Sequence, residues 1–394
     1  SDEKHRVSYS EHSEGVGIAG RAVLPAMILC HVSGLIFLPL MPVLFETLAQ
    51  AYFLSPLQLG AIGSVQLGCT AIGAFLLTRL GAGISCRALV VVAITVELLV
   101  NSACVFLESI EIISVLRGVA GLAEGVLLAG ASAGAVIKGR TAQYFVYYNI
   151  GLALFAVASL VGGAGVVQQF GYSAGFALIA VVNFTSLLLI YAGFPGFKLK
   201  QTSDDEISNI VDTHQLTKAF LALVFFGVAL AGTQAFIGRF SESHGISVEA
   251  ISFSLGVGWS IAILTPLLVM PLINRAGVVI PLIVGYLILF FIVVALSLLE
   301  LPAMFLIVAA LFTPTALFIQ PLQFGVLGAI DPGGRLAALG PAAISVGSAT
   351  GPVLVGVAVG FWGLGSVGIV AAGMLILSIV SLYPLMNISL TDRS

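Results

Sequence analysis

Apolar stretches long enough to cross a membrane follow one another along the chain, from about residue 22 to about residue 387, and polar segments separate them. A hydrocarbon core about 30 Å thick is crossed by a helix of about 20 apolar residues. The pattern therefore predicts an all-α polytopic membrane protein with twelve transmembrane helices. We expect these helices at 22–47, 57–79, 88–108, 112–136, 142–166, 173–194, 217–240, 248–271, 279–299, 303–328, 337–360 and 366–387.

The polar breaks are short except for residues 195–218, which divide the predicted helices into two groups of six. Within this break, "SDDE" at 203–206 has the pattern of a helix capping box, and apolar residues follow it at helical spacing. We expect a short amphipathic helix there. The expected units are a disordered tail at 1–20, a six-helix bundle at 21–194, a linker at 195–217, a second six-helix bundle at 218–388 and a short tail at 389–394.

The basic residues fall on one side of this topology. Of the 15 Lys and Arg residues, only Arg117 and Arg239 lie elsewhere. The opposite side carries six glutamates instead, namely Glu46, Glu108, Glu111, Glu242, Glu249 and Glu300. Because basic loops of membrane proteins face the cytoplasm, we expect both termini and the linker to be cytoplasmic and the protein to lie in the inner (plasma) membrane.

The composition supports the membrane class. The 394 residues are 59% hydrophobic and 8% charged, with a mean hydropathy of +1.15, which is unlike a soluble domain. No basic face suggests a nucleic-acid partner, so the expected partners are a small-molecule substrate and the lipid bilayer, and we expect a monomer. Because no nucleophile–base pair or nucleotide-binding loop is present, we expect no enzymatic activity and no cofactor, only a coupling ion, H⁺.

The two groups of helices repeat a short motif. "FLLTRLGA" at 75–82 ends the second predicted helix, and "PLINRAGV" at 271–278 ends the eighth, 196 residues later. Together with the twelve helices and the long linker, this repeat resembles the major facilitator superfamily of secondary transporters. The resemblance implies two six-helix halves that rock around a central site. In the fourth predicted helix, Arg117, Gly121 and Gly125 match the R-x-x-x-G-x-x-x-G pattern of that family.

The resemblance also implies a conformational latch at the cytoplasmic ends of the helices. Thr78 and Asn274 stand where the family has acidic residues, and both side chains can still accept a hydrogen bond from arginine. The residues expected to form the latch are Thr78, Arg79, Arg87, Asn274, Arg275, Asp331 and Arg335.

Two opposite charges lie inside the fourth predicted helix, in "RGVAGLAEG" at 117–125. Counted from Glu111, Arg117 lies about 9 Å and Glu124 about 20 Å into the membrane, on nearly the same helix face. Since a charge that faces lipid is costly, both should face a cavity or partners. We expect Arg117 and Gly121 to contact substrate, with Gly121 leaving that face open, and Glu124 to carry the coupling proton. A purely structural role for Arg117, holding neighbouring helices together, is the alternative.

Other polar residues lie at mid-membrane depth. Arg117 followed by Glu124 is similar to the R-x-x-x-G-x-x-E-G pattern of organic-anion/proton symporters in the superfamily. These relatives usually have an acid in the first span, where this chain has His31, so His31 is a candidate for proton transfer or substrate contact, or else a core histidine. With Met27 and Cys30 it would offer soft metal ligands, but no matching cluster exists, so we expect no metal site. Glu97 is a second candidate for protonation. Tyr147, Gln234 and Trp259 are the expected recognition residues.

These residues predict a secondary active transporter for a small organic solute, with an organic anion as the expected substrate. When Glu124 takes a proton, Arg117 loses its counter-charge and can bind an anion, which gives proton-coupled symport by alternating access. One alternative is a proton-coupled antiporter that exports drugs or other amphipathic or cationic compounds. A non-transporting receptor or scaffold with a transporter fold is the alternative from another class.

Overall fold

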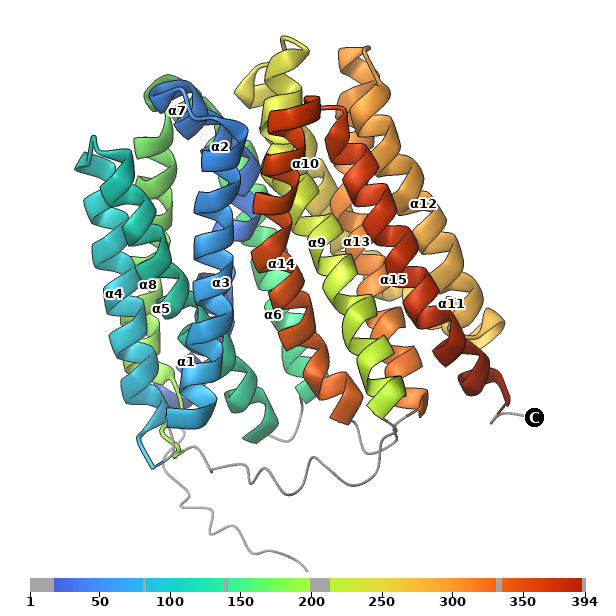
Figure 1. Ribbon diagram of the computed structural model, residues 1–394. Coiled ribbons are helices and arrows are strands. Elements are labelled where there is room, and N and C mark those ends of the chain that lie inside the picture. Colours follow the sequence, from blue (N-terminus) through green and yellow to red (C-terminus); the bar gives the residue numbers. More distant parts are fainter. Residues whose placement is uncertain (1–17, 81–82, 138–140, 199–212, 331–334, 392–394) are drawn as a thin grey trace, which may run out of the picture.

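The structure, a computed structural model, describes residues 18–80, 83–137, 141–198, 213–330 and 335–391, and within these ranges a few side chains near the helix ends are left undescribed. Figure 1 shows two helical bundles side by side, the first formed by α1–α8 and the second by α9–α15. The predicted tail at 1–20 lies almost wholly outside the described residues, and so does the predicted linker helix at 203–211.

Ten helices or helix pairs are long and apolar enough to cross a membrane, and the bent pair α6–α7 is an eleventh. The short apolar helix α10, continued by α11 after two residues, completes a set of twelve. The elements are α1 (Ile18–Gly34), α2 (Phe37–Tyr52), α3 (Pro56–Leu80), α4 (Cys86–Phe106), α5 (Ile110–Ile137), α6 (Thr141–Val157), η1 (Ala158–Gly162), α7 (Ala164–Phe170), α8 (Tyr172–Gly193), α9 (Thr213–Ser243), α10 (Val248–Ala262), α11 (Thr265–Ala276), α12 (Val279–Leu298), α13 (Pro302–Ile330), α14 (Arg335–Trp362) and α15 (Ser366–Thr391). The predicted all-α fold with twelve spans is confirmed.

Three spans differ from their predicted form. The first is longer than expected, running from Ala22 to Tyr52, and is interrupted between α1 and α2. The fifth bends by 53° between Gly162 and Ala164 after a turn of π-helix, and the eighth breaks at residues 263–264. Apolar composition sets the length of a span, but it does not report such local breaks. Gly34, Gly162, Gly163 and Pro266 lie beside them, so glycine and proline mark these positions where hydrophobicity does not.

Glycines bring α3 and α5 into backbone contact in the first bundle. A Cβ atom at Gly121 would overlap the carbonyl oxygen of Gln66, and one at Gly125 would overlap that of Thr70. Gly73 makes the reciprocal contact from α3 against Leu122. Small residues allow membrane helices to pack this closely. The expectation that Gly121 leaves an open helix face is therefore wrong, because α3 covers it.

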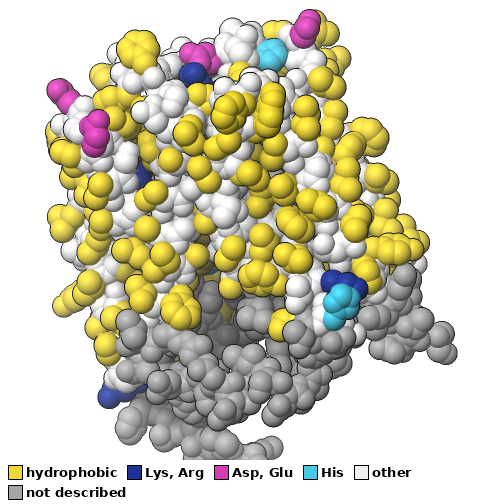
Figure 2. Space-filling model, viewed as in Figure 1, with side chains coloured by type: hydrophobic (Ala, Val, Ile, Leu, Met, Phe, Trp, Pro, Cys, Tyr) yellow, Lys and Arg dark blue, Asp and Glu magenta, His cyan; other side chains and the backbone are white. Residues whose placement is uncertain are grey.

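The two bundles meet mainly through α3 with α14, α2 with α9, and α6–α7 with α10. The hydrogen bonds across this interface include Gln234 Nε2 to the Leu38 carbonyl (3.3 Å), Val353 N to Ser64 Oγ (3.0 Å) and Glu249 N to Gln168 Oε1 (3.3 Å). These contacts lie toward the end that we call the acidic end, which holds the loops at 53–55, 107–109, 244–247, 299–301 and 363–365. Figure 2 shows acidic side chains gathered at this end, at the top of the view, above a hydrophobic surface.

Gly125 offers a test of the α3–α5 contact. The methyl group of Gly125→Ala would overlap the Thr70 carbonyl, and overpacking of this kind costs about 1–3 kcal/mol. We expect this substitution to lower the Tm of the detergent-solubilised protein by several degrees. Gly373→Ala in α15 is the matched control, since nothing lies within 4 Å of its added Cβ. Equal Tm values for the two variants would contradict the packing described.

Candidate functional site

A cluster of buried polar side chains lies inside the first bundle, between α3, α4, α5 and α8. Each of its members is 8% exposed or less, in a bundle whose interior is otherwise largely apolar. We call it the polar cluster; its residues are Gln66, Thr70, Glu97, Asn101, Arg117, Glu124 and Asn183.

Glu124 is held by α3. Gln66 Nε2 donates a hydrogen bond to Glu124 Oε1 at 2.8 Å, and Thr70 Oγ lies 3.2 Å from Glu124 Oε2. Gln66 and Thr70 are one helical turn apart, so they present both side chains on the same face of α3. The glycine contacts between α3 and α5 bring that face within reach of the carboxyl group. Glu124 thus has neutral partners, and its side chain is 3% exposed.

Arg117 is held by a different set of partners. Its Nη2 donates to Asn101 Oδ1 at 2.8 Å and lies 3.6 Å from Cys104 Sγ, while the guanidinium sits 4.6 Å from the centre of the Phe176 ring. The Nε atom is buried without a hydrogen-bond partner. No nitrogen of Arg117 forms an ion pair with Glu124, since no such pair lies within 4.0 Å. Each charge of the "RGVAGLAEG" stretch therefore has its own neutral partners.

Glu97 is the third charged residue of the cluster. It is fully buried on α4, and neither of its carboxyl oxygens has a hydrogen-bond partner. It lies within electrostatic range of Glu124 and Arg117 and close to Asn183, whose amide is also without a hydrogen bond. With both acids ionised the three groups would carry one net negative charge, and an uncompensated buried charge is costly. One proton added to the cluster removes that charge.

His31 and Tyr147 lie near the contact between α1 and α6. The His31 ring is 4% exposed and stacks on Tyr148 at a centroid distance of 4.7 Å, with 15° between the rings. Tyr148 in turn donates to the Ala131 carbonyl at 2.9 Å. Tyr147 is half-buried beside Tyr144. Their roles in substrate or proton binding stay predictions.

In the second bundle, two of the predicted recognition residues are buried. Gln234 joins the bundles through its bond to Leu38, and Trp259 is 4% exposed on α10, next to the close contact of Gly258 with Ala310. A neutral hydrogen-bonded group connects α9, α12, α13 and α15: Tyr286 Oη lies 2.6 Å from Ser378 Oγ, Gln323 Nε2 donates to Tyr286 Oη at 2.5 Å, and Ser378 donates to the Ala222 carbonyl.

The predicted latch is described only in part. Asp331 lies outside the described residues, and the side chains of Thr78, Arg79, Asn274 and Arg335 are not described. Arg87 donates to the Tyr191 carbonyl and lies 5.8 Å from the centre of that ring, a contact within the first bundle. Arg275 is exposed at the end of α11. The latch stays a prediction.

Arg239 links the bundles at the acidic end. Its Nη1 lies 2.7 Å from Glu242 Oε2 on its own helix and 3.8 Å from Glu46 Oε1 on α2. Gln50 Nε2 donates to Glu46 at 2.8 Å and to Glu242 at 3.4 Å. Glu46 is only 2% exposed, and the partly exposed Arg239 is its counter-charge. We call this group the acidic-end bridge.

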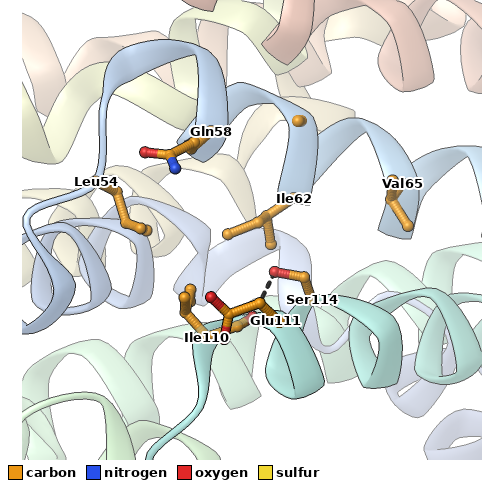
Figure 3. Close-up of a pocket in the computed structure, with 8 residues that line it drawn as sticks. Leu54, Gln58, Ile62, Val65, Ile110, Glu111 and Ser114 are labelled. Carbon is orange, nitrogen blue, oxygen red and sulfur yellow. Dashed lines mark hydrogen bonds between the residues drawn. The ribbon is translucent and has the colours of Figure 1, made fainter.

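A surface groove of about 240 Å³ lies between α3 and α5 near the acidic end (Figure 3). It is mostly apolar and open, and Glu111 is its one charged side chain. The residues that line it are Leu54, Gln58, Ala61, Ile62, Val65, Ile110, Glu111 and Ser114. None of them belongs to the polar cluster, so the groove is a separate feature.

Sequence reasoning found the three charged residues of the cluster but missed Gln66, Thr70, Asn101 and Asn183. The available pattern was their polar character within apolar spans, and for Gln66 and Thr70 also the four-residue spacing. Depth in the membrane does not distinguish these four residues from other polar residues, because serine, threonine and asparagine in a span often bond only to their own helix. Thr47 is an example, since it bonds to the carbonyls of Val43 and Leu44.

The apolar spans define a multi-pass membrane protein. Residues 23–330 match the Major Facilitator Superfamily, and the chain belongs to this family. No functionally curated protein matches the sequence.

Solved structures share the fold at low sequence identity. The nucleoside transporter NupG has a TM-score of 0.70 at 13% identity, covering 91% of this chain and 98% of that one. The human organic anion transporter MFSD10 has a TM-score of 0.65 at 13% identity, with 92% and 99% covered. A bacterial homologue of the human lysosomal transporter Spinster, in an inward-facing and occupied conformation, has a TM-score of 0.68 at 16% identity, with 95% and 96% covered.

The acidic-end bridge predicts a measurable coupling between α2 and α9. Arg239→Gln leaves the buried Glu46 without a cation, which we expect to cost about 1–3 kcal/mol and to lower Tm. Glu46→Gln in the same chain should recover most of that loss, because the double variant has no unpaired charge. Glu242→Gln, at a side chain that is 43% exposed, is the control and should change Tm little. Additive effects of the Arg239 and Glu46 substitutions would show that the pair does not interact.

Proposed function

We propose that the protein is a secondary active transporter that moves a small organic anion together with a proton. The two six-helix halves rock around a central site, which is the general mechanism of transporters built from such repeats. The nucleoside transporter and the organic anion transporter are similar to this chain in fold alone, so they do not indicate its substrate. We infer the substrate class from the polar cluster instead.

The unpaired positive charge of Arg117 carries the proposal. Its partners are the Asn101 amide, the Cys104 sulfur and the Phe176 ring, and none of them neutralises the guanidinium. Its Nε–H is also free to donate. The nearby carboxylates of Glu124 and Glu97 balance Arg117 only through space. When a proton neutralises one of them, the attraction of the cluster for an anion rises.

The conformation described here is closed at the acidic end, and it buries the cluster. Arg117 is 1% and Glu124 3% exposed. A substrate therefore reaches Arg117 only after the helices around the cluster have moved apart. Helix α3 links such a movement to the second bundle, because it bonds to Glu124 on one side and contacts the second bundle on the other.

Glu124→Gln tests the coupling. In proteoliposomes with an imposed pH gradient, we expect this variant to lose concentrative uptake at least about tenfold, while exchange of substrate across the membrane continues, because the neutral amide cannot release a proton. Glu300→Gln, at an exposed acid in the loop before α13, is the matched control and should keep wild-type uptake. Concentrative uptake by Glu124→Gln with the wild-type pH dependence would refute the proposal.

A second candidate is proton-coupled export of organic cations. The observation that favours it is the excess of carboxyl groups over guanidinium groups in the cluster, Glu97 and Glu124 against Arg117. In this mechanism, a cation and a proton compete for the same carboxylates, and the expelled cation is exchanged for an entering proton. The two candidates therefore differ in the sign of the substrate.

A ligand screen by thermal shift decides that sign. A ligand that binds only the folded protein stabilises it by RT ln(1 + L/Kd), where L is the free concentration of the ligand, so we expect organic anions to raise Tm and amphipathic cations to leave it unchanged. Arg117→Ala should lose the anion effect. Asn101→Leu is the control, because it breaks the same hydrogen bond but keeps the guanidinium, so it should still respond to anions. Stabilisation by cations that persists in Arg117→Ala would select the export mechanism.

A further inference from the structure

Helix α3 separates the polar cluster from the second bundle. Gln66 and Thr70 lie on the face toward α5, where they contact Glu124. Ser64 and Gly68 lie on the opposite face, since successive residues turn by about 100° and residues two apart by about 200°. One helix thus contacts a titratable group on one side and the other half of the protein on the other.

The face toward the second bundle is tightly packed. Ser64 Oγ accepts a hydrogen bond from Val353 N at 3.0 Å, and a Cβ atom at Gly60 would overlap the Pro352 carbonyl. One further turn along, a Cβ atom at Gly68 would lie 3.6 Å from Ala349. A small change in the curvature of α3 would therefore be transmitted directly to α14.

The Thr70 hydroxyl has two acceptors and one proton. Its Oγ lies 3.0 Å from the Gln66 carbonyl oxygen and 3.2 Å from Glu124 Oε2. A hydroxyl donates one hydrogen bond at a time and accepts through its lone pairs. When Glu124 is ionised, the carboxylate is the stronger acceptor and takes the Thr70 proton. When Glu124 is protonated, the acid donates to Thr70 Oγ, and the Thr70 proton goes to the Gln66 carbonyl.

We expect this exchange to change the curvature of α3. A threonine that donates to the carbonyl four residues earlier competes with the helix hydrogen bond and tends to bend the helix. The bond between Thr70 and Gln66 is of this type. No proton leaves Thr70 in the exchange, because only its hydroxyl direction changes, and the proton gained by Glu124 comes from solvent.

We propose that Thr70 is a positioning residue that transmits the protonation state of Glu124 to the α3–α14 contact. The inference rests on the proposed function, in which Glu124 carries the coupling proton. Gln66 acts with Thr70, since its amide donates to the other carboxyl oxygen in both states and keeps the carboxyl group facing α3.

The other titratable groups around Glu124 form no hydrogen bond with its carboxyl group. Glu97 on α4 and Arg117 on α5 act through space. From α3, the thiol of Cys69 lies against Gly118, and its Cβ atom lies against Gly121. From α1, Cys30 donates to the Leu127 carbonyl, and Gly34 contacts the Glu124 backbone.

The first experiment measures Glu124 protonation without a substrate. In full-length protein in detergent, infrared difference spectra during a pH titration report the carboxylic C=O stretch, and Glu124→Gln identifies the band. Thr70→Val removes a donor to the carboxylate, so we expect the midpoint of the band to move by about one unit toward higher pH. Thr70→Ser retains the hydroxyl and should titrate as the wild type does. Thr47→Val is the matched control, since that buried hydroxyl bonds only to its own helix.

The second experiment measures transmission to the interface. Spin labels attached at Glu108→Cys and Glu300→Cys, which lie in exposed loops of the two bundles, report the distance between the halves. Cys69→Ser is added to prevent labelling elsewhere, since Cys69 is the one endogenous thiol that is not fully buried. In the wild type and in Thr70→Ser, we expect the distance between the labels to change between acidic and alkaline buffer. The pH at the midpoint of this change should equal the midpoint of the infrared band. In Thr70→Val the band should still titrate while the distance stays constant.

The outcomes separate the two proposals. A wild-type midpoint and a wild-type distance change in Thr70→Val would overturn the role of Thr70 and leave Glu124 as the proton site. If Glu124→Gln removes no titrating band, the proposed proton coupling fails, and the role of Thr70 fails with it. If Thr70 has only a structural role, Thr70→Val should lower Tm, and the distance should still change at the same pH as the infrared band.

Discussion

The first bundle depends on the need to hold charges without water. Arg117, Glu124 and Glu97 lie where hydrocarbon and apolar side chains would otherwise surround them, and a bare charge there is costly. Neutral dipoles from α3 and α4 compensate two of them, since Gln66 and Thr70 bond to Glu124 and Asn101 bonds to Arg117. The two bonds to Glu124 require backbone contact between α3 and α5, which only glycine permits at Gly121 and Gly125. The hydrogen bonds that compensate Glu124 therefore depend on the close packing of α3 against α5.

The two halves share an architecture but differ in the chemistry of their interiors. The second bundle has a neutral group, Tyr286–Ser378–Gln323, which ties its helices together by hydrogen bonds that do not depend on a charged residue. Its hydrogen bonds also help to close the acidic end, where Gln234 contacts Leu38. The first bundle alone concentrates buried charge among the described residues. In the proposed mechanism, proton chemistry is therefore confined to one half, and the other half is the partner against which it moves.

The fold followed from the sequence to a large degree. The thickness of a bilayer is a constraint that each span satisfies on its own, so local hydrophobicity gave twelve spans in nearly the observed positions. The breaks near residues 35–36 and 263–264 did not follow, because no charge marks them, and the local signals beside them, Gly34 and Pro266, do not by themselves show whether a span is broken or only bent. The depth of Arg117 and Glu124 was predicted from helix rise. Their assumed open face at Gly121 was wrong, because a glycine pattern is equally typical of close packing, and only the position of α3 distinguishes the two.

The sequence by itself determined the class of protein, the number and approximate extent of the spans and which charged residues lie within them. These properties depend on one helix at a time, on its length, its hydrophobicity and its rise per residue. The tertiary structure decided which neighbour each buried charge contacts. That choice depends on how each helix is rotated against the others. It placed Gln66 and Thr70 on Glu124, Asn101 on Arg117 and Tyr148 on His31. Hydrogen bonds act over about 3 Å, so a rotation of one helix by the roughly 100° between successive residues would have given the groups on that helix different partners.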